Sequence, residues 1–420
     1  MKIIVHRGTD QIGGCVTEYE HEGWRLFVDY GEQLPGAPKS DIPLEVEGLT
    51  KGDLSKSALL ITHYHGDHIG KIVELAPNLP IYMGKISRDI VKEFANHMKT
   101  VDAACSALLQ RLHSVSTFSP GKPFGFGPFT IMPVMIDHSA FDAYAFRIEV
   151  GDVRVLHTGD FRTHGFRSGK LPKLIDKFIG RVDYLVCEAT NVARPDVACK
   201  SENELQSEFE VAFKAQKYNI VYLSSTNIDR LFALYHAAQW SGRCFVVDEY
   251  QKNIMDIVTR PGTLWSKSKM YRYQRYELKV LYNRAGFSVE GKFKKLLDKK
   301  GYVLIARANP RFDDIISKLP GEFKHRYLSM WNGYLNPNSA AFNPMLAHSL
   351  GSDFRYMHTS GHCDMKSLHT LFDMLNPKAV IPIHTDNPAA FAQLFSEKWP
   401  VVLLKDGEPF NPTSPTAFQE

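Results

Sequence analysis

The sequence predicts an α/β protein that carries its chemistry at the carboxyl ends of strands. Apolar runs typical of buried strands alternate with segments typical of helices along most of the chain. A dense cluster of histidines follows one of these runs, and a single His or Asp follows several others. Strand ends are where α/β proteins place their functional groups. With 420 residues, 44% of them hydrophobic, the chain is long enough for a large core and two or three domains.

The chain enters its first strand at once, because Met1–Arg7 leads directly to Gly8. We therefore expect no signal peptide, and the lack of any apolar run of about 18 residues predicts no transmembrane helix. The six cysteines are scattered without a Cys-x-x-Cys pair, which suits a reducing cytoplasm and indicates neither disulfides nor a cysteine zinc site. We interpret Cys187 and Cys363, which flank candidate site residues, as small buried hydrophobic side chains.

The densest signal places three imidazoles and one carboxylate within six consecutive positions: His63, His65, Asp67 and His68. The apolar run Ala58–Ile61 predicts a buried strand before them, and a helix is expected from Gly70 onward. In an extended segment side chains alternate between faces, so His63 and His65 point the same way, as two ligands of one ion must. The glycine that follows permits a turn, after which the aspartate and last histidine can face a second ion. Surface histidines in a loop are the alternative, but the density favours a dinuclear metal site.

Three further strand ends carry residues of the same kind. His138 follows the strand-like Phe129–Ile136, Asp160 closes an apolar run from Val153, and His384 ends a run from Ala379. A lone His or Asp at a strand end is more often structural. However, two ions need more than four protein groups, and these three strand ends resemble the first one. We therefore expect them to supply the missing ligands.

In this order the residues resemble a known family. Asp29, the histidine cluster, His138 and Asp160 resemble the four motifs of the metallo-β-lactamase superfamily. Three later segments resemble motifs A, B and C of its β-CASP nucleases: Leu185–Asn191, His358–His362 and Ile381–His384. Asp137–Ser139 and His157–Arg162 are similar to the corresponding stretches of the ribonuclease J family. That family continues into an extra C-terminal domain used in dimerisation, whereas this chain stops at Glu420.

The resemblance implies a fold and its boundaries. A metallo-β-lactamase αββα sandwich is expected over residues 1–195, interrupted by an inserted α/β β-CASP domain at 196–345 and completed by 346–420. Three apolar runs inside the insertion favour a small parallel sheet: Asn219–Leu223, Cys244–Asp248 and Tyr302–Ala306.

The resemblance also implies the ligand sets. One ion would be held by His63, His65 and His138, and the other by Asp67, His68 and His384, with Asp160 between them. Mostly nitrogen ligands with carboxylates suit two zinc ions, and manganese is the alternative. A hydroxide held between the ions would attack a phosphodiester in line.

The remaining site residues receive supporting roles. Asp29 would orient a ligand from behind. His362 would contact the scissile phosphate or protonate the leaving oxygen, and Glu188 would orient His362 and keep it protonated. Asp67 and Asp160 complete the expected catalytic set.

A basic window spans Gln251 to Met330, with 18 Lys and Arg against 7 Asp and Glu, a net charge of +11 in a chain whose total is +4. Aromatic residues are interleaved with the basic ones, among them Trp265, Tyr271, Tyr273, Tyr276, Tyr282, Phe287 and Phe293. Phosphate neutralisation and base stacking would let such a surface bind a nucleic acid. For the short run Lys292–Lys300, a solvated helix face is the simpler interpretation.

A strand, a polar loop and a helix start follow one another in Asn219–Leu231. Hydroxyl groups and free backbone N–H groups at a helix start form an anion site, so Ser224, Asn227 and Arg230 are candidate substrate contacts, together with Ser360 and His362 of motif B. Ordinary capping of the helix by Thr226 or Asn227 is an equally good interpretation.

The choice of substrate rests on resemblance. A histidine at motif C, here His384, is typical of RNA-processing members, whereas DNA nucleases of the family carry valine. Single-stranded RNA is therefore expected, with DNA as the alternative; endonucleolytic or 5′-exonucleolytic action and the oligomeric state stay open. A small-substrate hydrolase of the same superfamily is disfavoured by the basic insertion. An inactive RNA-binding subunit is disfavoured because no ligand is missing.

Overall fold

The computed structural model describes residues 1–37, 43–195, 199–263, 265–282 and 289–412, and the chain divides into two compact units. Unit 1 comprises Met1–Cys199 with Gly361–Glu420, and unit 2 comprises Lys200–Ser360. From the sequence we expected the second boundary at residue 345. The structure places it later, because strand β17 (Phe354–Tyr356) pairs with β16 (His325–Leu328) in the sheet of unit 2.

The first sheet of unit 1 has its strands in the order β19-β1-β2-β3-β4-β5-β6. They are β19 (Pro409–Phe410), β1 (Lys2–Arg7), β2 (Val16–His21), β3 (Trp24–Val28), β4 (Ser57–Leu60), β5 (Ile81–Gly84) and β6 (Ser116–Phe118). Strands β1 to β3 pair antiparallel, and β3 to β6 pair parallel. All four residues of β4 are buried, as expected for a strand covered on both faces.

The second sheet of unit 1 has the order β18-β11-β10-β9-β8-β7. Its strands are β18 (Ala379–Ile383), β11 (Tyr184–Glu188), β10 (Val153–His157), β9 (Ala143–Val150), β8 (Phe129–Ile136) and β7 (Phe124–Phe126). Strands β10, β11 and β18 are parallel, so their carboxyl ends meet at one edge. The structure thus confirms the expected strands that precede His138, Asp160 and His384.

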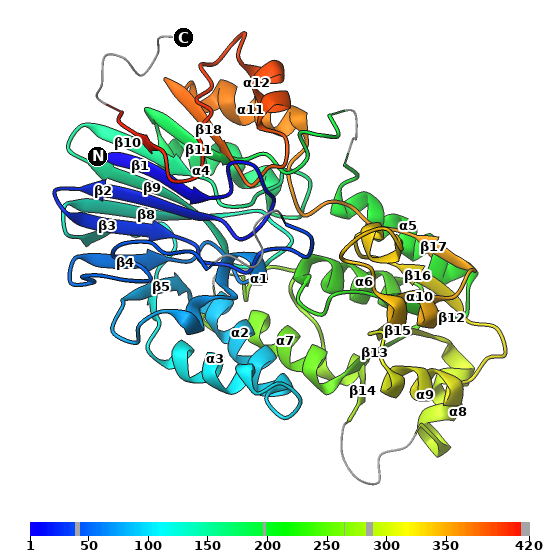
Figure 1. Ribbon diagram of the computed structural model, residues 1–420. Coiled ribbons are helices and arrows are strands. Elements are labelled where there is room, and N and C mark those ends of the chain that lie inside the picture. Colours follow the sequence, from blue (N-terminus) through cyan, green and yellow to red (C-terminus); the bar gives the residue numbers. More distant parts are fainter. Residues whose placement is uncertain (38–42, 196–198, 264, 283–288, 413–420) are drawn as a thin grey trace. The chain divides into compact units, whose positions relative to one another are not determined.

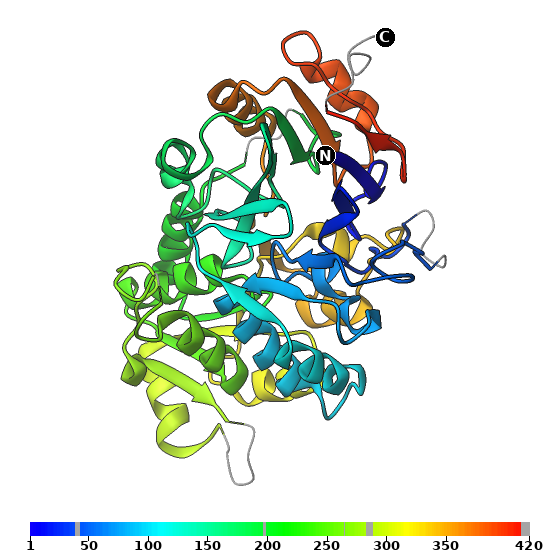
Figure 2. The ribbon, with the colours of Figure 1, turned by 90° about the vertical axis from the view of Figure 1, so that its left-hand side faces the viewer.

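The two sheets face one another between helices (Figures 1 and 2). The hydroxyl of Tyr19 on β2 is hydrogen-bonded to Nδ1 of His157 on β10 (3.0 Å), and Phe118 of β6 packs edge-on against Tyr144 of β9. Helices α2 (Lys85–Met98) and α3 (Ala104–His113) lie beside the first sheet. Helices α4 (Leu171–Leu174), α11 (Met365–Leu375) and α12 (Pro388–Phe395) lie beside the second, which completes an αββα sandwich.

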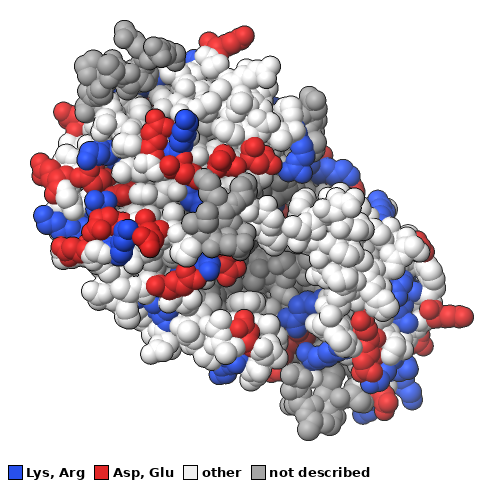
Figure 3. Space-filling model, viewed as in Figure 1, with Lys and Arg blue, Asp and Glu red and all other residues white. Residues whose placement is uncertain are grey.

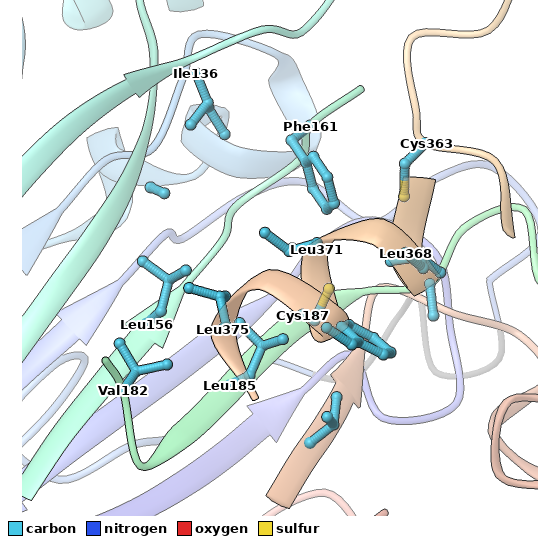
Figure 4. Close-up of a cluster of buried hydrophobic side chains, with 14 of the residues drawn as sticks. Ile136, Leu156, Phe161, Val182, Leu185, Cys187, Cys363, Leu368, Leu371 and Leu375 are labelled. Atoms are coloured by element: carbon cyan, nitrogen blue, oxygen red, sulfur yellow. The ribbon is translucent and has the colours of Figure 1, made fainter. Parts of the chain in front are cut away.

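Helix α11 illustrates how the outer core forms. Asp364 caps its start by accepting from Ser367 N (2.8 Å), and Asn376 ends it in the left-handed conformation. Its buried residues recur at helical spacing: Leu368, Leu371, Phe372 and Leu375. Figure 4 shows Leu371 and Leu375 facing the side chains of the second sheet. Cys187 and Cys363 belong to this hydrophobic cluster, which confirms their interpretation as buried apolar side chains.

Unit 2 is built on an all-parallel sheet of order β14-β13-β15-β12-β16-β17. Its remaining strands are β12 (Tyr218–Tyr222), β13 (Cys244–Asp248), β14 (Leu278–Leu281) and β15 (Tyr302–Ala306), and its helices are α5 (Glu202–Ala215), α6 (Ile228–Trp240), α7 (Glu249–Thr259), α8 (Gly291–Lys300), α9 (Pro310–Lys318) and α10 (Pro344–Leu350). The structure confirms the parallel sheet expected from the three apolar runs.

Charged side chains are interspersed on the face of the molecule drawn in Figure 3, where acidic and basic residues lie beside one another over strands β1 to β3. All six cysteines are free thiols. Within the described residues, no helix has both the length and the apolar character needed to cross a membrane.

Candidate metal centre

The histidine cluster leaves strand β4 in an extended conformation and enters a short helix, α1 (Gly66–Ile69). The helix therefore begins before Gly70, where the sequence analysis expected it, and Gly70 is its C-cap residue. Backbone hydrogen bonds from distant loops stabilise this single turn, among them Tyr30 N to His68 O (2.9 Å) and Gly14 N to Asp67 O (3.0 Å). The local sequence does not reveal these partners, but they fix the backbone that carries Asp67 and His68.

Three imidazole nitrogens converge in a first group formed by His63, His65 and His138. His65 Nδ1 lies 3.1 Å from His63 Nε2 and 3.2 Å from His138 Nε2. Nitrogens bound tetrahedrally to one zinc ion at about 2.1 Å would lie about 3.4 Å apart. The group therefore fits one divalent cation, and it is the set expected for the first ion.

The outer ring nitrogens of this group are held in place. His138 Nδ1 donates to Gly361 O (2.6 Å), and His63 Nδ1 lies 3.0 Å from Thr62 Oγ1. Thr62 Oγ1 gives its own proton to Asp29 Oδ2 (2.7 Å), so it accepts the proton of His63 Nδ1. The hydrogen-bond network thereby assigns the tautomers of both rings and leaves each Nε2 lone pair directed into the group.

Asp67, His68 and His384 form a second group. His384 Nε2 lies 3.4 Å from Asp67 Oδ2, and His68 Nε2 lies 3.8 Å from the same oxygen. His68 Nδ1 is bound to Asp29 Oδ2 (2.7 Å), whereas its Nε2 is buried and faces the carboxylates of Asp160 (3.2 Å) and Asp67 without a hydrogen bond of good geometry among the described residues. A buried imidazole nitrogen left in this state is expected where a cation is its partner. These residues fit the second ion of the sequence analysis.

Asp160 lies between the two groups. It follows β10 through the turn Thr158–Gly159, and its Oδ2 lies 3.2 Å from His68 Nε2. The same oxygen is 3.9 Å from His63 Nε2 and 4.0 Å from His138 Nε2. One carboxylate thus reaches nitrogens of both groups, as expected of a residue that would be shared by two cations.

The electrostatics favour cations in this site. Burial lowers the pKa of His65 to about 4, and burial also holds the pKa values of His63 and His138 well below the ordinary value. Their lone pairs are therefore available at neutral pH. Burial opposes a positive charge on His68, but nearby carboxylates, Asp160 first among them, outweigh burial and raise its pKa. The second group thus has an excess of negative charge.

Glu188 ends strand β11 and positions His362 beside the two groups. Its carboxylate oxygens lie 3.2 and 3.3 Å from His362 Nδ1, and they also accept from Phe161 N (3.1 Å) and Thr190 Oγ1 (2.7 Å). Burial would lower the pKa of His362, but the carboxylates of Glu188 and Asp160 outweigh burial and raise it to about 9. Glu188 is also close enough to Asp160, His362 and His384 for these four residues to share one ion. However, the hydrogen bonds above already occupy the carboxylate oxygens of Glu188.

Two site residues adopt backbone conformations that ordinary residues avoid. Asp29 directly follows β3 with φ of +62°, and His384 directly follows β18 with φ of +53°. Left-handed φ values at non-glycine residues are uncommon and concentrate at functional sites. Backbone hydrogen bonds hold both residues: Asp29 N donates to Leu60 O (2.8 Å) and His384 N donates to Gly8 O (2.8 Å).

Three supporting residues had no assigned role in the sequence analysis. Thr62 connects Asp29 to His63, Gly361 accepts from His138, and Thr190 Oγ1 lies 2.8 Å from His384 Nδ1. Thr62 directly precedes the histidine cluster and Thr190 lies within the segment Leu185–Asn191, so their positions in the sequence could have indicated a role. Gly361 acts through its carbonyl, which carries no side-chain signal.

The structure contradicts the part that Arg230 was expected to play in an anion site at the start of α6. Arg230 is 0% exposed, and its guanidinium is paired with Glu202 through Nε (2.8 Å) and Nη2 (3.0 Å). Asn227 caps α6 by accepting from Arg230 N (3.3 Å), which is the alternative interpretation. Ser224 is exposed, and its Oγ lies 3.1 Å from Thr226 Oγ1. Ser360 is the last residue of unit 2.

Part of the aromatic content of the basic window is structural. Tyr271 is 1% exposed and donates to Asp229 Oδ1 (2.7 Å), while Tyr273 donates to Asp256. Tyr276 is 77% exposed and remains available for stacking. Phe287 lies outside the described residues. Helix α8 exposes its lysines to solvent, in agreement with the simpler interpretation of Lys292–Lys300.

The chain is similar to known proteins along most of its length. A family model described as RMMBL, the Zn-dependent metallo-hydrolase RNA specificity domain, matches residues 352–404. Ribonuclease J of Mycobacterium tuberculosis is 27% identical over 256 residues, which cover 58% of this chain and 43% of that protein. Ribonuclease J of Sinorhizobium meliloti is 23% identical over 382 residues, which cover 87% of this chain and 64% of that protein. The chain thus spans about half the length of the curated relatives it matches.

A solved structure shares the fold. The crystal structure of a protein of unknown function from Enterococcus faecalis V583 superimposes with a TM-score of 0.74 at 18% sequence identity. The match covers 97% of this chain and 99% of that chain. At this level of identity the likeness bears on the fold alone.

Proposed function

We propose that this chain, a ribonuclease J-like member of the metallo-β-lactamase and β-CASP proteins, is a metal-dependent nuclease that hydrolyses phosphodiester bonds of single-stranded RNA. The observation that carries the proposal is the pair of ligand groups on either side of Asp160, in which the outer ring nitrogens of His63, His138, His68 and His384 are held by hydrogen bonds. Two zinc ions suit this donor set of imidazoles and carboxylates, and manganese is the alternative.

Each group of the chain has a distinct part in the reaction. When bound, a pair of divalent ions supplies a water nucleophile at neutral pH and stabilises the charge that develops on a phosphoryl group. Asp29 and Thr62 hold His68 and His63 in orientation, and Thr190 does the same for His384.

His362 is the proton donor in this proposal. Glu188 keeps its ring protonated and anchors Nδ1, so the opposite nitrogen, Nε2, presents a proton to a phosphate oxygen or to the leaving ribose oxygen. The His362 side chain is 23% exposed, whereas that of Glu188 is fully buried, which fits a contact with substrate for His362 and a positioning role for Glu188.

RNA is favoured over DNA by two observations. The family model that matches residues 352–404 is described as an RNA specificity domain, and the curated relatives are ribonucleases. His384 at the third β-CASP motif is also the residue typical of RNA-processing members. A DNA nuclease of the same family is the second candidate.

The test is incubation of the zinc-loaded full chain with 5′-labelled single-stranded RNA, the matched DNA and a chromogenic lactam. Cleavage of RNA well above DNA, abolished by a chelator and restored by zinc or manganese, is expected. Cleavage of DNA alone would assign the chain to the second candidate, and hydrolysis of the lactam without either nucleic acid would replace the nuclease proposal by a small-substrate hydrolase. The size of the labelled products separates endonucleolytic from 5′-exonucleolytic action.

A further inference from the structure

Unit 2 contains a polar pocket that has no part in the metal centre. It has a volume of about 420 Å³ and lies between the end of α7 and the segment that follows it. Three arginines line it, Arg260, Arg272 and Arg275, together with Asp256 and Tyr273. Pockets that hold small ligands have volumes of about 300–1,000 Å³, so this one has room for a mononucleotide.

The charges around the pocket favour an anion. The pocket is lined by three arginines and by one carboxylate, that of Asp256. The negative charge of this carboxylate is already balanced by its neighbours. Lys252 Nζ lies 2.6 Å from Asp256 Oδ2, Tyr273 donates its hydroxyl to Asp256, and Arg275 Nη2 lies 3.3 Å from Oδ1. Lys252 and its neighbours keep the pKa of Asp256 below its ordinary value although burial acts in the opposite direction. The pocket is therefore net positive at neutral pH.

Arg272 and Arg275 retain donors for a ligand. Arg272 makes one hydrogen bond within the described residues, from Nε to Ser266 O (3.4 Å), so its terminal nitrogens can bind elsewhere. The Arg275 side chain is 78% exposed and uses Nη2 for Asp256. A guanidinium group can bind two phosphate oxygens at once through two parallel hydrogen bonds. Two arginines in one pocket therefore suit a phosphate group better than a single carboxylate.

Part of the pocket wall is held in place by packing and hydrogen bonds. Tyr273 packs against Phe232 and Tyr235 of α6, with ring centroids 6.4 and 6.1 Å apart. Helix α7 continues into a segment held by its own hydrogen bonds, such as Thr263 Oγ1 to Val258 O (3.1 Å) and Ser266 N to Thr263 O (3.3 Å). A wall that is already ordered loses little conformational entropy on binding, which favours affinity.

We propose that this arginine pocket binds a phosphate group of a ribonucleotide, either within an RNA strand or as a free mononucleotide. The inference rests on the proposed RNA substrate only for the source of the phosphate. An internal phosphate of a bound strand would make the pocket an anchor outside the metal centre, whereas a free mononucleotide would make it a separate ligand site.

The experiment compares two double variants of the full chain that remove equal charge from unit 2. Arg272→Gln with Arg275→Gln removes two pocket arginines, and Lys292→Gln with Lys299→Gln removes two exposed lysines of α8. Binding of a fluorescent single-stranded RNA is measured by fluorescence anisotropy at salt concentrations from about 50 to about 200 mM, a range over which the loss of phosphate contacts changes the affinity measurably. A chelator is present to prevent cleavage. Calorimetry with AMP and with inorganic phosphate forms the second arm. Zinc content and thermal unfolding report the integrity of each variant.

The pocket variant should bind RNA about tenfold or more weakly, and its slope of log affinity against log salt should flatten by about 1.4, the value for two lost contacts to a single strand. The lysine variant should change less. Loss of AMP binding in the pocket variant, with AMP competing against RNA, identifies a terminal or free phosphate; loss of RNA affinity without AMP binding identifies an internal phosphate.

Equal RNA affinity and slope in both double variants, together with no AMP binding by the unaltered chain, would overturn the proposal. If the double variant unfolds, Arg272→Gln alone gives the same test. This single substitution removes only one long hydrogen bond from the fold, the 3.4 Å bond from Arg272 Nε to Ser266 O. None of these readouts requires RNA cleavage, so failure of the proposed nuclease activity would leave them interpretable.

Discussion

His384 Nδ1 lies 2.8 Å from Thr190 Oγ1, which gives its own proton to Glu188 Oε2 at 2.7 Å. The hydroxyl therefore accepts the proton of His384 Nδ1 and directs Nε2 toward Asp67. Thr190 also lies 3.2 Å from His362 Nδ1. One buried hydroxyl thus connects the second ligand group to the Glu188–His362 pair.

Thr190→Val keeps the shape of the side chain but removes this acceptor. We expect the affinity for the second metal ion to fall about 10- to 100-fold, the usual cost of losing a partner that orients a ligand. Thr190→Ser retains the hydroxyl and should restore most of that affinity. Zinc content after competition with a graded chelator series measures the effect, and equal zinc retention by the valine and serine variants would remove Thr190 from this role.

Asp160 and His362 should differ in what they lose. Asp160→Ala removes the carboxylate that reaches both groups, so the zinc content and the cleavage of RNA should fall together. His362→Ala should keep its metal while losing turnover, because His362 is proposed to transfer a proton or contact the phosphate. Elemental analysis beside single-turnover cleavage separates the two variants. Loss of an ion from His362→Ala would place that residue among the ligands instead.

Gly361→Ala probes the carbonyl that holds His138. A Cβ atom at this position would lie 2.6 Å from Ser139 Oγ and 3.4 Å from His138 Cε1, so either the Ser139 side chain or the backbone of Gly361 must shift. We expect weaker zinc binding at the first group with little change in the thermal unfolding of metal-free protein. Gly169→Ala is the matched control in unit 1, because a Cβ there meets nothing within 4 Å. Similar zinc affinity in both variants would show that the Gly361 carbonyl does not position His138.

The sequence indicated the candidate ligands because each one lies within a few residues of a buried strand or in the short turn after it, which is a local pattern. It did not predict the partners that orient them, since these depend on contacts between residues far apart in the chain. Gly361 accepts from His138 across 223 positions, and a carbonyl leaves no trace in the sequence. Arg230 was misinterpreted for the same reason. A basic residue in the first turn of a helix suggests anion binding, but its burial against Glu202 becomes visible only in the folded unit.

Arg230 should therefore matter for stability. Removing one partner of a buried ion pair costs about 3–5 kcal/mol, because the other charge remains buried without compensation. Arg230→Met should accordingly lower the midpoint of thermal unfolding strongly, and Glu202→Gln should do the same. The double variant Arg230→Met with Glu202→Leu leaves neither charge and should recover much of the loss, although Ser329 also loses its contact with Arg230. A single Arg230→Met variant that unfolds like the unaltered chain but binds RNA more weakly would instead reinstate Arg230 as a substrate contact.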